Sequence, residues 1–194
     1  MKKSLLALSV ALLGGAPPTL SYAALAPHAG LVSDYRYRGI SQTRLKPALQ
    51  GGADYTNGGF YLGAWGSTIQ WLKDVDSDGD VEIDLYGGYK GEISKGLGYD
   101  VGVLTYVYPS NDLSPDADTT EIYGALSFGP ATLKYSHALT HLFGAPDSKN
   151  SFYLDLSATF DVGGWSLVPH VGHQKIKGPL SGASYSDASL TLSK

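Results

Sequence analysis

The residues most suggestive of chemistry are the carboxylates of one polar segment, residues 74–80. Asp74, Asp76 and Asp78 alternate ahead of a glycine, as ligands do at the start of a calcium loop. The twelfth position from Asp74 is Leu85, where such a loop needs a bidentate Glu, and strand-like rather than helical sequence flanks it. We therefore expect a solvated loop and no metal site. Weak binding of a divalent cation by the three aspartates is the alternative.

Serine and histidine side chains are the candidates for catalysis. Ser136 and His137 are adjacent, and because adjacent strand residues point to opposite faces they cannot pair as nucleophile and base. His170 and His173 are three residues apart, so on a strand they point to opposite faces, which argues against a shared metal ion. No phosphate-binding glycine motif and no nucleic-acid patch is present in the sequence. The sequence predicts no enzymatic activity, no cofactor and no nucleic-acid partner, with lipid modification as a minor alternative.

Charged and amide side chains recur on the polar face of alternating segments. They are Asp34, Arg36, Arg38, Gln50, Asp54, Glu82, Asp84, Lys90, Asp100, Glu121, Lys134, Asp155 and Asp187. In a narrow closed sheet such groups line a polar conduit, and their acidic excess favours cations. They can equally pair across the interior and plug it. Both interpretations stay open at this point.

Composition narrows the class of protein that positions these side chains. Lys2 and Lys3, the apolar run 5–13 and Ser21-Tyr22-Ala23 predict a cleaved signal peptide over residues 1–23. That run is about half the ~20 apolar residues of a membrane helix. The chain has no Cys, and charged residues make up 16%, against roughly 25% in soluble domains. A large part of the surface is therefore expected not to face water.

Residues 24–194 contain about ten segments that alternate with the period of a strand. They span 31–38, 47–55, 60–70, 81–90, 99–108, 120–128, 131–140, 151–160, 165–174 and 186–194. Tight turns at 56–59, 129–130 and 161–164 alternate with longer polar loops, so each kind of connection collects at one end of an antiparallel sheet. Only the connection 91–98 is longer than a tight turn should be. Because strands cross a bilayer only as a closed sheet, the sequence predicts an all-β antiparallel transmembrane barrel.

Aromatic residues flank the predicted tight turns. They are Tyr55, Phe60, Phe128, Phe160 and Trp165, and in a barrel they form an aromatic girdle at the lipid–water boundary. In a soluble β-sandwich they would instead cap the core. A sandwich would also carry frequent Lys and Glu on its polar face, whereas Gly, Ser, Thr and Tyr prevail here. The membrane barrel is therefore favoured.

Several segments in order resemble the TorF family of porins, outer-membrane proteins of unknown role. They are SDYRYRGISQ (33–42) with KPALQGG (46–52), GFYLGAWGS (59–67), EIDLYGGY (82–89) and YVYP (106–109). The resemblance implies a barrel and its location, and it transfers no binding residue. Relatives continue through about two more strands and finish on an aromatic residue, whereas this chain stops at Lys194 in mid-alternation. We therefore expect a truncated C-terminus, with about ten strands present of a twelve-stranded parent.

These patterns together predict a protein of the Gram-negative outer membrane that forms a narrow channel for small polar solutes or ions. The alternative is a non-conducting structural or adhesive barrel. Expected partners are outer-membrane lipid and lipopolysaccharide, with periplasmic chaperones and the barrel-assembly machinery acting during insertion. The sequence predicts no particular oligomeric state.

Overall fold

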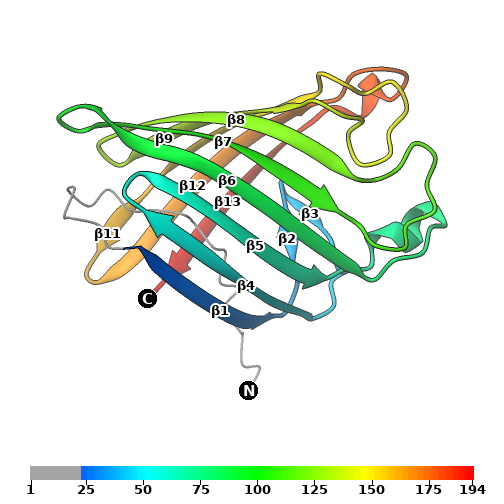
Figure 1. The fold of residues 1–194 in the computed structure, drawn as a ribbon, viewed down its shortest axis with the longest axis horizontal. Helices are drawn as coiled ribbons and strands as arrows, with labels where there is room; N and C mark the ends of the chain where they lie inside the picture. Colours follow the sequence, from blue (N-terminus) through cyan, green and yellow to red (C-terminus); the bar gives the residue numbers. More distant parts are fainter. Residues whose placement is uncertain (1–22) are drawn as a thin grey trace.

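The computed structural model describes residues 23–194, so the predicted signal peptide lies outside the described residues except for Ala23. Eleven strands form one antiparallel sheet, and two short strands form a separate hairpin (Figure 1). The sheet strands are β1 (Ala24–Val32), β4 (Ala48–Asn57), β5 (Phe60–Thr68), β6 (Val81–Ser94), β7 (Leu97–Val107), β8 (Thr119–Phe128), β9 (Ala131–Ala138), β10 (Phe152–Ala158), β11 (Phe160–Val162), β12 (Trp165–Lys175) and β13 (Tyr185–Ser193). The hairpin strands are β2 (Arg36–Tyr37) and β3 (Ile40–Ser41). The predicted all-β antiparallel class is confirmed.

Each strand of the large sheet pairs with its neighbours in chain order. β10 and β11 both pair with β12 and are separated only by Thr159, so they act as one interrupted strand. The sheet thus has the ten strand positions expected. β1 and β13 each have one partner, and no pairing joins them within residues 23–194. Closure into a barrel and the twelve-stranded parent therefore stay predictions.

The connections confirm the predicted asymmetry and correct it at one place. Two-residue turns join β4 to β5, β8 to β9 and β11 to β12, while long loops join the strands at the opposite end (Figure 1). The expectation of a long connection at 91–98 is wrong. β6 continues to Ser94 and β7 begins at Leu97, so only Lys95 and Gly96 connect them. Gly96 has φ +81°, a conformation that glycine adopts without steric penalty.

The predicted first strand, 31–38, is also wrong. The first strand of the sheet is β1, and its pairing with β4 ends at Val32↔Ala48. Arg36 and Tyr37 instead pair back on β3 through a turn at Arg38 and Gly39, whose φ angles are 45° and 80°. Positive φ at both central residues is typical of a two-residue hairpin turn. The alternation seen here belongs to a hairpin outside the large sheet.

The two faces of the sheet have opposite character. On β6, Ile83 and Leu85 are 36% and 50% exposed, whereas Glu82, directly before Ile83, is 2% exposed. The same alternation places Glu121 of β8 and Gln174 of β12 among the buried residues. We call the face that carries these buried polar groups the inner face. The opposite, outer face carries exposed aliphatic side chains along the strands of the sheet. A soluble β-protein has the reverse distribution.

A cluster of aromatic and aliphatic side chains closes the long-loop end, and we call it the cap. Its buried members are Ile69, Leu72, Tyr106, Tyr108 and Ala117, with Tyr35, Tyr37, Trp71, Leu104, Leu113 and Phe143 packed against them. They come from the 33–47 segment, from β7 and from three long loops, which gather at one end of the sheet in Figure 1. No helix within residues 23–194 is long and apolar enough to cross a membrane.

Candidate functional site: the polar interior

The β2–β3 hairpin crosses the interior and ends on the opposite wall. Arg38 at its tip donates two hydrogen bonds to the Glu121 carboxylate (3.0 and 2.7 Å) and one to Gln174 Oε1 (2.7 Å). The Arg38 and Glu121 side chains are 7% and 1% exposed. The Arg38 guanidinium also lies 4.3 Å from the centre of the Tyr153 ring. A planar guanidinium matches this fork of acceptors, so the tip is fixed by charge-assisted hydrogen bonds.

The arms of the hairpin make further contacts with the wall. The Tyr35 hydroxyl donates to Glu82 Oε1 of β6 (2.6 Å), and the Tyr37 hydroxyl lies 2.6 Å from that of Tyr106 on β7. A Cβ atom placed on Gly39 would lie only 2.6 Å from Asp187 Cβ, so the tip also abuts β13. The sheet therefore curls around the hairpin from β6 to β13, as the front and rear strands of Figure 1 also indicate.

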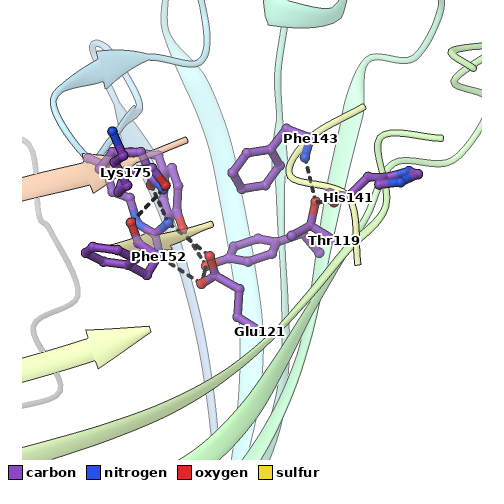
Figure 2. Close-up of polar contacts among 10 residues, drawn as sticks. Thr119, Glu121, His141, Phe143, Phe152 and Lys175 are labelled. Carbon is purple, nitrogen blue, oxygen red and sulfur yellow. Dashed lines mark hydrogen bonds and ion pairs between the residues drawn. The ribbon is translucent and has the colours of Figure 1, made fainter. Parts of the chain in front are cut away.

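Glu121 lies where the wall, the hairpin and the cap meet (Figure 2). Two positions earlier on β8, the Thr119 hydroxyl donates to the His141 carbonyl (3.1 Å) and accepts the Phe143 N–H (2.8 Å). The Phe143 ring packs edge-on against Tyr106 at 5.2 Å. The loop after β9 is thereby held over the interior, directly beside the Arg38–Glu121 pair.

The base of the hairpin is tied to its own segment. Asp34 accepts hydrogen bonds from the Ser41 hydroxyl (2.5 Å) and the Thr43 hydroxyl (3.1 Å). Arg36 pairs with Asp34 at 2.8 Å, but its side chain is 55% exposed and the structure gives it no bond to the wall. The prediction that Asp34, Arg36 and Arg38 lie on the wall is wrong, because all three belong to the 33–47 segment. Only Arg38 reaches across.

Nearer the tight turns, tyrosines and carboxylates line the inner face. The Tyr61 hydroxyl contacts Asp100 Oδ1 and the Tyr123 hydroxyl, each at 2.5 Å. The Lys134 ammonium lies 4.0 Å from the centre of the Tyr123 ring. A Cβ atom on Gly102 would lie 2.5 Å from the Tyr123 hydroxyl, so this glycine provides the space that the tyrosine occupies.

A second cluster on the inner face surrounds His170 of β12. Its Nε2 lies 2.5 Å from Asp155 Oδ2, and its Nδ1 lies 3.5 Å from Asp187 Oδ1. The Tyr153 hydroxyl donates to Asp187 Oδ2 (2.8 Å). Sequence reasoning proposed both aspartates but missed His170 and the inner tyrosines. Alternation offered a signal for the tyrosine, because Tyr153 and Asp155 are two positions apart on β10 and therefore share a face.

The other predicted conduit residues occupy inner-face positions of the strands. Gln50 donates to Ser67 (3.3 Å), and Asp54 accepts from the Tyr86 hydroxyl (2.5 Å). Lys90 is exposed, with its ammonium 5.8 Å from the Tyr61 ring centre. Asp84 Oδ1 is buried without a hydrogen-bond partner. Apart from Asp34 and Arg36, the predicted polar residues therefore lie on the inner face or reach it, and only some of them are paired.

Aromatic side chains near the tight turns lie on the outer surface. Phe60, Phe128, Phe160 and Trp165 are 45%, 69%, 44% and 38% exposed, and Tyr55 is half-buried. The structure adds a pair that the sequence prediction missed: Tyr89 and Tyr99 stack with ring centres 6.3 Å apart. Tyr89 also pairs in register with Phe60. These rings lie on the outer face near the tight turns, and their role as an aromatic girdle stays a prediction.

The aspartate-rich loop uses its carboxylates in local contacts. Asp74 pairs with Arg44 (3.1 Å), and Asp80 pairs with Lys73 (2.6 Å). In the described part of the chain, no group of three or more His, Cys, Asp or Glu is arranged to hold a metal ion. The calcium-like spacing of Asp74, Asp76 and Asp78 has no structural counterpart there.

One aspartate joins two of the long loops. Asp112 accepts a hydrogen bond from the Ser77 hydroxyl (2.6 Å) and another from the Asp78 backbone N–H (3.3 Å). These hydrogen bonds lower the pKa of the Asp112 carboxyl because they favour its charged form.

The structure confirms that the Ser and His side chains considered for catalysis or metal binding point to opposite faces of their strands. Ser136 is buried on the inner face, while His137 contacts the Tyr135 hydroxyl (3.0 Å) on the other side of the strand. His173 contacts Ser186 (2.9 Å), away from the His170 cluster. These two proposed pairs therefore do not form, and the absence of enzymatic activity stays a prediction.

Comparison with known proteins places the chain among bacterial proteins. Residues 16–194 match the family model described as "Bacterial protein of unknown function (Gcw_chp)". The chain belongs to this family. No curated protein and no solved structure matches it. The family assignment covers almost the whole chain and carries no activity, so the function of this Gcw_chp protein must be inferred from its geometry.

Proposed function

We propose that this Gcw_chp protein is an outer-membrane β-barrel whose interior forms a narrow passage for small polar solutes or ions. The proposal rests on the distribution of apolar and polar side chains between the two faces, which is the reverse of that in a soluble protein. Apolar residues such as Leu85 and Leu154 are 50% and 41% exposed on the outer face, while Glu82 and Glu121 are 2% and 1% exposed inside. Hydrocarbon outside and a polar interior are the two environments that this arrangement satisfies.

Two further features of the structure support a membrane location. Tight turns lie at one end and long loops at the other, which is the plan of outer-membrane barrels. Aromatic side chains surround the tight-turn end on the outer face, where they suit a lipid–water boundary. In lipid the edges β1 and β13 require hydrogen-bond partners, so the proposal includes closure of the sheet. The resemblance to TorF-family porins agrees with this proposal.

The alternative function is a non-conducting structural or adhesive barrel. It is favoured by one observation, the buried Arg38–Glu121 pair, which fixes the tip of the hairpin to β8 across the interior. In either case the expected partners are outer-membrane lipid and lipopolysaccharide. Insertion would use periplasmic chaperones and the barrel-assembly machinery. Metal binding by the aspartate-rich loop has no supporting geometry in the described residues. Ser136 and His137 lie on opposite faces of β9 and form no catalytic pair.

Refolding into lipid vesicles, followed by planar-bilayer recording, tests the proposal. We expect a heat-modifiable band on gels, because a closed barrel resists detergent until it is boiled, and discrete current steps in the bilayer. A folded, inserted protein that never conducts would favour the structural alternative. A folded monomer that stays in water without detergent would contradict both, because the outer face would then be hydrated.

A further inference from the structure

We propose that the turn at Arg38–Gly39 is the constriction of the interior, and that Arg38 is the residue that sets its width and charge preference. This inference rests on the proposed passage and names the element that controls it.

The hairpin contacts strands that lie far from the two strands to which it is joined. β1 ends at Val32 and β4 begins at Ala48, so the 33–47 segment starts and finishes on adjacent strands. Its tip nevertheless contacts Glu121 of β8, Gln174 of β12 and the Asp187 position of β13. The hairpin therefore spans the interior from one wall to the opposite wall. A solute that follows the inner face must pass beside this tip.

The charge at the tip carries the second step. Arg38 is paired with Glu121, while Asp84 nearby keeps one carboxylate oxygen without a hydrogen-bond partner. The Glu82 carboxylate, two residues before Asp84 on the same face, is held by an uncharged donor, Tyr35. Arg38 is thus the cation that binds Glu121 on this acidic part of the inner face, while the Lys134 ammonium lies over the Tyr123 ring. Removing Arg38 takes away the cation that Glu121 binds and makes this part of the passage more acidic, and acidic groups that line a passage select for cations.

The rest of the hairpin offers a matched control. Arg36 carries the same side chain two residues earlier, but it pairs only with Asp34 and the Gly39 carbonyl of its own segment. Its side chain is 55% exposed. An exchange at this position removes the same formal charge and one hydrogen bond within the hairpin. It leaves the contacts of Arg38 with Glu121 and Gln174 on the wall in place.

The experiment compares the wild type, Arg38→Gln and Arg36→Gln in planar bilayers with a KCl gradient. For Arg38→Gln we expect conductance to rise by roughly twofold or more and the reversal potential to move toward the cation value. Arg36→Gln should match the wild type in both readouts. If the wild type conducts and Arg38→Gln has the same conductance and reversal potential, the constriction role is wrong. The channel proposal would stay intact.

A second variant covers the case in which Arg38→Gln does not fold. The Gln42 N–H donates to the Tyr35 carbonyl (2.7 Å), so these two residues already form the next pair of the hairpin. Replacing residues 36–41 by Asn-Gly would close a two-residue turn on that pair and remove the tip. We expect this variant to fold and to conduct more than the wild type. If it inserts and conducts no better than a conducting wild type, the constriction role is wrong. If neither protein conducts, the proposed passage itself is wrong.

Discussion

Replacing one leucine of the outer face by arginine should show whether that face lies in lipid or in water. Leu85 lies midway along the outer-face row from Val81 to Tyr89 on β6, and Tyr89 pairs in register with Phe60 beside the tight turn. At ~3.3 Å per residue that row is roughly 26 Å long. With a strand tilt of about 40° it spans roughly 20 Å of membrane thickness, close to the ~25 Å apolar band of outer-membrane barrels. Leu85 should therefore lie near the bilayer midplane.

At that depth Leu85→Arg should lower the free energy of unfolding by about 2–4 kcal/mol, which is roughly 30- to 700-fold in the folding equilibrium. Leu180 provides a matched control, because it is 49% exposed against 50% for Leu85 but lies in the loop before β13. Leu180→Arg should change stability by less than about 0.5 kcal/mol. The assay is urea unfolding in lipid vesicles. Equal, small effects at both positions would refute the assignment of the outer face to lipid.

Three further predictions follow from contacts in the interior and the loops. Gly102→Ala should destabilise the fold by about 1–3 kcal/mol through overpacking, because the added Cβ would lie 2.6 Å from a backbone oxygen. Gly124 is the control, since the atom nearest to its added Cβ would be 3.9 Å away. Gly124→Ala should therefore be near neutral in the same unfolding assay. Glu121→Ala leaves the buried Arg38 guanidinium without its ion-pair partner and should lower the free energy of unfolding by about 3–5 kcal/mol. Arg36→Ala breaks an exposed ion pair and should lower it by less than ~1 kcal/mol. Equal losses would contradict the argument from burial. The pKa of Asp112 is lowered by folding, so its stabilising contact between two loops should be fully present above about pH 3.9 and lost as the pH falls below it. The protection factors of the amides at 76–80, which correct for the pH dependence of intrinsic exchange, should therefore fall on acidification in the wild type. In an Asp112→Asn variant they should not depend on pH in this range.

The strands were predictable because each signal is local. Alternation on β6 separates Ile83 and Leu85 from Glu82 and Asp84, and the structure places these pairs on opposite faces. The same signal continues through Ile93, which is 62% exposed. Alternation therefore extends over the full length of β6, whereas the predicted strand ended at residue 90.

The arrangement of the interior was not predictable from local pattern. Alternation at Tyr35 and Tyr37 is genuine, yet it cannot tell a strand of the wall from an arm of a hairpin folded inside it. The contact between Arg38 and Glu121 joins residues 83 apart in the chain, and the contact with Gln174 joins residues 136 apart. Such pairs depend on how the sheet curls, and curl is a property of the whole sheet rather than of any segment. The sequence left a conduit and a plug equally open for this reason.

The most direct test of the central claim compares two neighbouring positions on β6. The chain contains no Cys, so Asp84→Cys and Leu85→Cys can each carry one nitroxide label in protein reconstituted into vesicles. Collision with oxygen, which concentrates in lipid, and with a water-soluble nickel complex would then be measured by electron paramagnetic resonance. We predict that the label at 85 collides with oxygen and hardly with nickel, while the label at 84 does not share this lipid signature. A label at 85 that collides with nickel as readily as one in a surface loop would contradict the claim that the outer face lies in hydrocarbon.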